Sequence, residues 1–327
     1  MSKLQLLIFS VLLLGGLASC TSEDVSADTT KAATYKSNIA DIDTYIASQT
    51  WTVKPTSVTS NSGLYFALTK PSTSTVSPQE GQELEFTYTL SILTSTTATS
   101  SSATSTTVVS AKIVDTVYAK NPIFIPYKKG ILKAGLEEGL LKMHEGEQAV
   151  LLMPSLIGYG DVLSSDGLVP ANSPLRFDVT LNRTRTEDQQ MDEYAASNSL
   201  NLTQKTSTGL RFFLTTPSTS VDSVKTALGK SQTVTIRYAA KQLHAKTVVR
   251  FDTVSSASLT STNLTNLVTG FAEGIVKLKV GDKATFLMPS SLGYKDAGVV
   301  DKSTTPAVYK VSPYAPLRYD VEVLSVK

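Results

Sequence analysis

The chain has 327 residues, which makes two domains the expectation from length. Its 30 Lys and Arg residues balance 28 Asp and Glu residues, so the net charge of +2 gives no electrostatic footprint for nucleic acid. Two histidines and one cysteine exclude disulfide frameworks, most zinc sites and cysteine–histidine hydrolases.

The first segment, residues 1–19, has the features of a bacterial secretory signal peptide. Lys3 supplies a short positive region, and the apolar run from Leu4 to Leu14 is too short for a stable transmembrane helix. Leu17-Ala-Ser-Cys20 resembles a lipobox, so we expect Cys20 to be lipidated and to become the mature N-terminus. The acyl chains would then anchor the protein to a membrane. The alternative is an ordinary cleaved signal in which Cys20 has no role.

Residues 20–35 are mostly polar, and we expect a flexible tether there. Glu23 and Asp24 resemble the export tag that some Gram-negative bacteria use for lipoproteins, although an acidic tether explains them equally well. The expected location is therefore the bacterial outer membrane, with the protein facing the periplasm or the cell surface.

Four sequence blocks occur twice in the same order, which indicates a duplication. The matched pairs are Asp43–Ser48 with Asp192–Ser197, Gly63–Ser74 with Gly209–Ser220, Leu152–Ser155 with Leu287–Ser290, and Pro174–Val179 with Pro316–Val321. The first pair carries a short helical signal upstream of each copy. We therefore expect a first domain over residues 36–186 and a second over residues 187–327.

Each copy is predicted to be mostly β-strand with one short helix, an α+β fold. The strand candidates are Leu84–Leu90, Ala149–Met153 and Leu175–Leu181 in the first copy, and Val234–Tyr238, Ala284–Met288 and Leu317–Leu324 in the second. The helix candidates are Gly135–Met143 and Gly270–Leu278. Residues 91–110 contain 14 Ser or Thr in 20 positions without an apolar period, so we expect a disordered insertion.

Common catalytic motifs are missing from the sequence. His144 and His244 have no meaningful partner spacing, and both are expected to be surface residues. There is no Gly-rich phosphate loop, no metal-ligand spacing and no nucleophile elbow. An enzyme of this sequence would have to work without nucleophile, metal or cofactor.

Six blocks in each copy together resemble the FKBP-type peptidyl-prolyl cis-trans isomerase domain. In the first copy they are Gly81–Tyr88, Val114-Asp115, Gly135–Gly139, Gly146–Ala149, Met153-Pro154 with Gly158–Gly160, and Phe177–Val179. In the second they are Thr235–Tyr238, Phe251-Asp252, Gly270–Gly274, Val280–Ala284, Gly293-Tyr294 and Tyr319–Val321. The resemblance implies two FKBP-like domains, each a five-stranded antiparallel sheet wrapped around a short helix, with an apolar pocket between them.

The resemblance also implies the residues of each pocket. In the first copy they are Tyr88, Asp115, Tyr159 and Phe177, with Val114, Leu132 and Leu136 at the pocket edge and floor. In the second they are Tyr238, Phe251, Asp252, Phe271, Tyr294 and Tyr319, with Leu267 and Val268 at the edge. The family resemblance further implies a backbone N–H, just before the helix, for the substrate carbonyl.

Such a pocket can act without a catalytic acid. Rotation about an X–Pro bond meets a barrier of ~18–20 kcal/mol because the planar amide loses resonance. The twisted amide is less polar than the planar one, so a dry aromatic cleft favours it. Val114, Leu136 and Lys133 in the first copy, and Lys295 in the second, depart from the family pattern.

Two functions remain open from the sequence. The leading hypothesis is a lipid-anchored, cofactor-independent prolyl isomerase that assists the folding of proline-containing exported proteins. The alternative is a catalytically degenerate pair of FKBP-like modules that bind protein or glycan partners.

Overall fold

The computed structural model describes residues 22–99, 105–243, 248–303 and 308–327. The chain divides into two compact units at Thr184–Arg185, with residues 81–83 and 126–128 grouped with the second. We call the two units the first and the second domain. The predicted signal peptide, Cys20, residues 100–104 and His244 lie outside the described residues.

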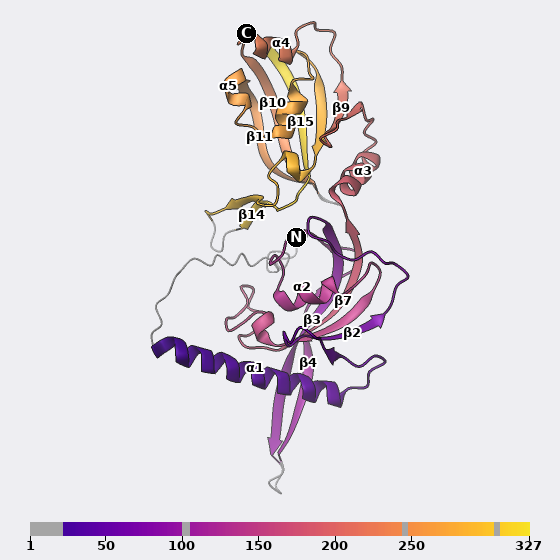
Figure 1. Ribbon diagram of the computed structural model, residues 1–327, viewed down its shortest axis with the longest axis vertical. Helices are drawn as coiled ribbons and strands as arrows, with labels where there is room; N and C mark the ends of the chain where they lie inside the picture. The colour runs from indigo at the N-terminus through magenta and orange to yellow at the C-terminus, as the bar shows by residue number, and fades with distance from the viewer. Residues whose placement is uncertain (1–21, 100–104, 244–247, 304–307) are drawn as a thin grey trace. The chain divides into compact units, whose positions relative to one another are not determined.

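The first domain is built on one antiparallel sheet of seven strands (Figure 1). Six of them follow the order β1-β2-β6-β7-β3-β4, and β5 pairs with β3. The bounds are β1 Thr56–Ser57, β2 Tyr65–Lys70, β3 Glu83–Thr99, β4 Ser105–Val117, β5 Ile123–Pro126, β6 Gln148–Met153 and β7 Leu175–Arg185.

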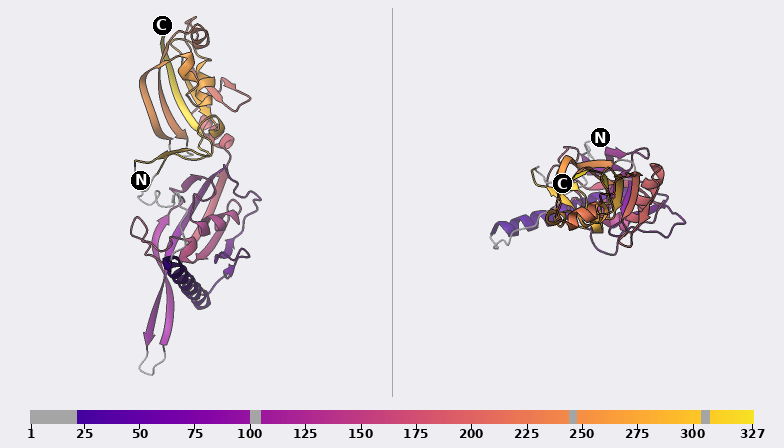
Figure 2. Two further views of the ribbon diagram at one scale, coloured as in Figure 1. Left: turned by 60° about the vertical axis from the view of Figure 1, so that its left-hand side comes forward. Right: turned by 90° about the horizontal axis from the view of Figure 1, so that it is seen from above.

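The second domain repeats this topology in a six-stranded sheet with the order β11-β10-β15-β12-β9-β8 (Figure 2). The bounds are β8 Gln204–Lys205, β9 Arg211–Thr216, β10 Val234–Leu243, β11 Val248–Leu259, β12 Lys283–Met288 and β15 Leu317–Val326. A separate hairpin, β13 Val299–Asp301 with β14 Val308–Val311, precedes the last strand. The predicted α+β fold with antiparallel sheets is confirmed, although both sheets exceed five strands.

One short helix packs against the inner face of each sheet, close to the predicted positions. These helices are α2 Ala134–Leu141 and α6 Thr269–Ile275. Glycines at matched positions face the sheet: a Cβ on Gly139 would lie 2.4 Å from Leu151 Cδ1, and one on Gly274 would lie 2.7 Å from Phe286 Cε2. Since real Cβ atoms do not approach so closely, the Gly-x-x-x-Gly spacing lets each helix lie directly on its sheet.

The predicted flexible tether over residues 20–35 is wrong for the residues that the structure describes. Helix α1 runs from Ser22 to Ser48 without interruption. Its last turns bury Ile42, Tyr45 and Ile46 against the sheet of the first domain. This apolar contact anchors the helix, because tertiary packing rather than intrinsic propensity stabilises most protein helices.

The predicted disordered insertion at residues 91–110 is also wrong for the residues of this segment that the structure describes. Strands β3 and β4 continue through this segment as one hairpin, paired from Tyr88–Val117 to Thr99–Ser105. The hydroxyls of Thr97 and Thr107 lie 3.1 Å apart across the two strands. Threonine is β-branched and favours strands, and paired threonines hydrogen-bond across a ladder, so a Thr-rich segment can be ordered without burial.

The short helical signals at Asp43–Ser48 and Asp192–Ser197 are confirmed as parts of α1 and α3 (Glu187–Ser197), and further helices that were not predicted are present. Helix α3 begins with a capping box between Thr186 and Gln189, and the second domain also contains α4 (Val224–Gly229) and α5 (Ser261–Leu264). Two short 3₁₀ helices, η2 Ser155–Ile157 and η3 Ser290–Leu292, follow β6 and β12.

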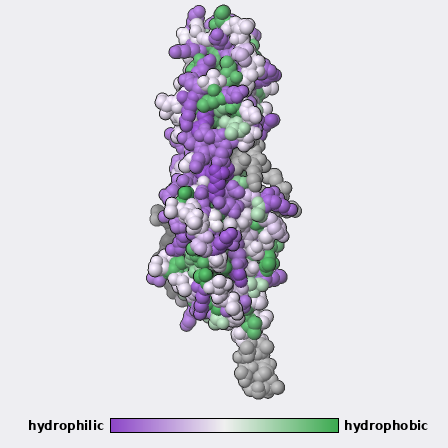
Figure 3. Space-filling model, turned by 90° about the vertical axis from the view of Figure 1, so that its right-hand side faces the viewer, coloured by the Kyte–Doolittle hydropathy of each residue, from purple (hydrophilic) through white to green (hydrophobic). Residues whose placement is uncertain are grey.

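The face of the molecule shown in Figure 3 is largely polar. In the view of Figure 3, hydrophobic residues are scattered in small groups among hydrophilic ones. Within the described ranges, every helix is too short or too polar to cross a membrane.

Candidate functional site

Five aromatic side chains predicted for the second pocket lie together on the inner face of the second domain. Tyr238 comes from β10, Phe251 from β11, Phe271 from α6 and Tyr319 from β15, while Tyr294 follows η3. The Phe271 ring centre lies 5.1 Å from that of Tyr319 and 5.4 Å from that of Tyr238. The Phe251 ring lies 5.9 Å from Tyr294 and 6.4 Å from Tyr319. These separations are those of favourable aromatic contacts.

The cluster has a buried floor and a partly open rim. Phe271 and Tyr319 are only 2% and 6% exposed. Tyr238, Phe251 and Tyr294 are partly exposed, and they pack against the same core. Three partly exposed rings therefore border two rings that are almost fully buried.

Asp252 fixes one ring of the rim. The Tyr238 hydroxyl donates a hydrogen bond of 2.8 Å to Asp252 Oδ2. Burial and this hydrogen bond raise the pKa of Tyr238 to about 12. Burial and neighbouring Tyr294 likewise raise the pKa of Tyr319. Both phenols therefore keep their protons at neutral pH, and the site offers hydroxyl donors rather than a titrating acid or base.

The start of α6 supplies the predicted pocket edge. Val268 is the N-cap residue of α6, and its carbonyl accepts from the Phe271 N–H at 3.0 Å. Leu267 and Val268 pack against the core that contains the ring cluster. No described residue accepts a hydrogen bond from the Val268 N–H. A substrate carbonyl could therefore take this donor.

Glu187 is a positioning residue that the sequence analysis missed. Its carboxylate accepts hydrogen bonds from the N–H and the hydroxyl of Ser290, the latter at 2.6 Å. Ser290 in turn accepts from the Lys295 N–H at 2.8 Å, which closes the turn around Tyr294. Helix α3 thus holds the tyrosine loop. The Thr186–Gln189 capping box marks this helix start in the sequence, but nothing there points to Ser290.

The corresponding residues of the first domain are brought together as well, with fewer rings. Tyr88 and Phe177 meet edge to face with ring centres 5.4 Å apart. Leu136 and Leu132 are buried beneath them, whereas Val114 and Asp115 are partly exposed. Burial and a hydrogen bond to Asp115 raise the pKa of Tyr88. The tyrosine–aspartate pair is therefore retained, but the ring at the helix start is not.

Lys133 changes the first pocket further. It is the N-cap residue of α2, the position that Val268 takes in α6. Its ammonium lies 4.8 Å from the centre of the Tyr159 ring, a cation–π contact. Burial lowers the pKa of Lys133, and burial together with nearby Asp166 and Asp115 raises the pKa of Tyr159. A cationic group therefore covers the loop tyrosine of the first domain.

The described residues contain no group of three or more His, Cys, Asp or Glu side chains that could hold a metal ion. His144 is 44% exposed and lies 3.5 Å from Glu147, as a surface residue.

Comparisons with known proteins agree on one family. The family model described as FKBP-type peptidyl-prolyl cis-trans isomerase matches residues 74–182 and 224–324. Among curated proteins, peptidyl-prolyl cis-trans isomerase FKBP9 of Rattus norvegicus is 25% identical over 228 residues, which cover 67% of this chain and 33% of that protein. This chain thus spans one third of the length of FKBP9.

A shorter match is to the probable FKBP-type isomerase FkpA of Neisseria meningitidis, at 35% identity over 63 residues, or 19% of this chain and 20% of that one. Among solved structures, the three FKBP domains of wheat FKBP73 cover 84% of this chain and 98% of their own, at 15% identity and a TM-score of 0.35. FkpA from Escherichia coli covers 43% of this chain and 57% of its own, at 23% identity and a TM-score of 0.33.

Proposed function

Because this chain belongs to the FKBP-type peptidyl-prolyl cis-trans isomerase family, we propose that it catalyses the rotation of X–Pro bonds and that its second domain carries this activity. The observation that supports the assignment to the second domain is the five-ring cluster, with Phe271 and Tyr319 as its floor and a free N–H at Val268.

In the proposed mechanism the pocket acts through its shape and through the exclusion of water, and no proton is transferred. The proline ring settles on Phe271 and Tyr319, where water is displaced. As the X–Pro bond twists, the amide loses resonance and polarity, and a low-polarity cleft favours that state over the planar one. The effect acts on the transition state more than on the ground state, which is the condition for rate enhancement.

Hydrogen bonds at the rim would hold the substrate in register. The Val268 N–H can donate to the carbonyl of the substrate, and the hydroxyl of Tyr294, whose ring lies against Phe251, is a second donor. Asp252 keeps Tyr238 oriented through their hydrogen bond. A fixed substrate loses less entropy in reaching the twisted geometry.

We propose that the first domain binds polypeptide with little catalysis. Leu136 leaves its pocket floor without a ring, and Lys133 lies over Tyr159. A cation at the pocket edge opposes the dry environment that the mechanism needs, since burying a charge costs free energy. The binding-module alternative from the sequence is therefore assigned to this half of the chain.

The proposed setting is the envelope of a bacterium. The apolar segment before Cys20 supports export, and lipidation of Cys20 would keep the protein at the outer membrane, on the periplasmic or the outer face. Its partners would be exported proteins with exposed proline bonds. In the described residues that follow, helix α1 spans the 27 residues from Ser22 to Ser48.

A proline-tetrapeptide assay of the full chain tests the catalytic assignment. We expect kcat/KM to fall about fivefold in Asp252→Ala and in Tyr294→Phe, since each removes a hydrogen bond worth about 1 kcal/mol. The matched variants Asp115→Ala and Tyr159→Phe should keep most of the activity. Absence of acceleration by the unaltered chain would contradict the isomerase assignment and favour binding modules in both halves.

A further inference from the structure

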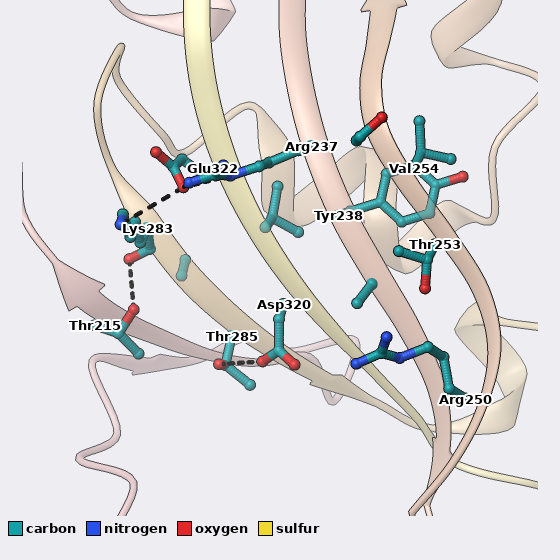
Figure 4. A pocket seen from close by; sticks show the side chains of 14 residues that line it. Thr215, Arg237, Tyr238, Arg250, Thr253, Val254, Lys283, Thr285, Asp320 and Glu322 are labelled. Carbon is teal, nitrogen blue, oxygen red and sulfur yellow. Dashed lines mark hydrogen bonds and ion pairs between the residues drawn. The ribbon is translucent and has the colours of Figure 1, made fainter.

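A groove of about 400 Å³ lies on the outer face of the second-domain sheet, on the side away from α6 (Figure 4). It crosses β11, β10, β15 and β12 and reaches Thr215 on β9. The floor is low because Ala239 and Thr285, together with Asp320, form its central row. Helix α3 covers the neighbouring part of this face through Met191, Phe213 and Leu287 and leaves the groove open.

Cations form both rims of the groove. On one side Arg237, Glu322 and Lys283 line the groove in a row across three strands. On the other side Arg250 lines the groove, and Lys241 and Arg318 are in register with it on the next two strands, beside the lining. Strand geometry puts the two rows about 13 Å apart along the strands, because four residues separate them at ~3.4 Å each. The groove is thus bordered by positive charge along its length.

The two carboxylates of the groove do not neutralise this charge. Glu322 accepts from Arg237 Nε at 2.7 Å and lies 3.6 Å from Lys283. Asp320 accepts from Lys241 at 2.6 Å and from Arg318 at 2.8 Å. Burial acts to raise the pKa of Asp320, but these two partners outweigh it and lower that pKa. Three cations and two carboxylates line the groove, an excess of one positive charge, and Lys241 and Arg318 add positive charge beside it.

Arg250 is the cation with no partner among the described residues. Its side chain extends from β11 into the groove, as Figure 4 shows. An exposed arginine whose guanidinium donates to no described residue is suited to bind a carboxylate in a bidentate manner.

The first domain shows that the fold does not require these charges. The pair Arg176–Asp178 corresponds to Arg318–Asp320 and is kept at 2.8 Å. The other rim positions are uncharged in the first domain, where Thr87, Ser91, Ile113, Gln148 and Thr180 stand in place of Arg237, Lys241, Arg250, Lys283 and Glu322. Exposed ion pairs add little stability, so folding does not explain the difference.

We propose that this groove binds an acidic, extended polypeptide segment, at a site separate from the proline pocket. An extended chain points successive side chains to opposite sides, so alternating carboxylates along a chain in the groove would reach both rims. A single small anion cannot span two rims this far apart. Tyr238 is the aromatic residue of the lining, but its ring packs against Phe271 on the other face of the sheet, so it offers no face in the groove on which a sugar ring could stack.

Fluorescence anisotropy of the full chain with a labelled, proline-free peptide, Ser-Glu-Ser-Glu-Ser-Glu-Ser-Glu, tests the proposal. We expect saturable binding that weakens as salt rises through about 0.15 M. The double variant Arg250→Gln/Lys283→Gln should bind about tenfold more weakly. The matched double variant Lys225→Gln/Lys230→Gln loses the same charge at exposed residues outside the groove and should bind as the unaltered chain does.

Two further arms separate the alternatives. Isomerase activity should be unchanged in Arg250→Gln/Lys283→Gln, so the result does not depend on the proposed catalytic role. Equal affinity for the corresponding Ser-Gln peptide, or equal loss of binding in both double variants, would overturn the proposal. Binding of polygalacturonate but not of the peptide, with dependence on Arg250 and Lys283, would also overturn it and assign the groove to an acidic glycan.

Discussion

The two domains share a framework but differ in their pockets. Six strands occur in the same spatial order in both, and a Gly-x-x-x-Gly helix lies on each sheet. At the helix start the second domain has Val268 and Phe271, whereas the first has Lys133 and Leu136. The duplication has therefore preserved the strand order and the helix glycines, and it has changed the side chains that would contact the substrate.

On the outer faces of the two sheets, the domains share an arginine that holds a helix but differ in the charges beside it. Arg176 donates to the Tyr45 hydroxyl at 2.6 Å and lies over its ring, and Arg318 makes the same contacts with Tyr194. These pairs hold α1 and α3 on their sheets, so both copies retain them. The rim cations beside them have no such structural role, and only the second domain has them.

The largest difference between the pockets should appear when the helix-start ring is removed. Phe271→Leu makes the second floor resemble the first, and we expect kcat/KM for a proline tetrapeptide to fall about tenfold because contacts with Tyr238 and Tyr319 are lost. The matched change Leu136→Met should alter activity little. Unfolding measured on the same samples controls for packing, since volume-conserving core changes usually cost under about 1.5 kcal/mol.

A smaller gain is expected when the first pocket is made more like the second. Lys133→Val removes the ammonium from Tyr159 and restores an aliphatic edge. In a chain that also carries Phe271→Leu, we expect activity to rise about threefold over Phe271→Leu alone. An unchanged or lower rate would show that Lys133 is not what limits the first domain.

Alkaline pH should destabilise both domains through their tyrosine–aspartate pairs. The pKa of Tyr238 is raised to about 12 in the folded chain, above its unfolded value near 10. The stabilisation is therefore complete below pH ~10 and is lost as pH rises toward 12. Tyr238→Phe should make this loss shallower in urea unfolding followed across that range, as should Tyr88→Phe in the first domain. An identical pH dependence in Tyr238→Phe would contradict the raised pKa.

The smallest effect concerns the turn after the loop tyrosine. Lys295 has a φ of +54°, where the first domain has Gly160 at +77°. A left-handed residue other than glycine costs ~1–2 kcal/mol, partly offset by the greater freedom of glycine in the unfolded chain. Lys295→Gly should stabilise the second domain by less than about 1 kcal/mol. Gly160→Ala should destabilise the first, although no atom lies within 4 Å of the added Cβ.

Much of the fold could be predicted from the sequence because the duplication repeats its signals. The helix predicted over Gly135–Met143 is observed over Ala134–Leu141, and the strands around both Met-Pro pairs agree with prediction. The Ser/Thr-rich segment was mispredicted because composition was weighed above the strand preference of threonine. Helix α1 was missed in part, although Ile39, Ile42 and Ile46 follow a helical spacing.

The candidate site depends on contacts that the sequence does not show. The residues of the ring cluster could be named from family resemblance, but the contact between Lys133 and Tyr159 becomes visible only in the folded structure. Glu187 acts across 103 positions of sequence on Ser290. The outer groove combines residues from five strands, so neither its shape nor its charge follows from any local pattern.

Photo-crosslinking tests most directly that the second domain binds the proline. The probe is a proline tetrapeptide with a photoreactive residue next to the proline, irradiated with the full chain and mapped by mass spectrometry. We predict crosslinks to the segments around Val268–Phe271 and Tyr294, and their loss in Phe271→Leu. Crosslinks concentrated around Leu132–Leu136 and Tyr159, or unchanged by Phe271→Leu, would contradict the account.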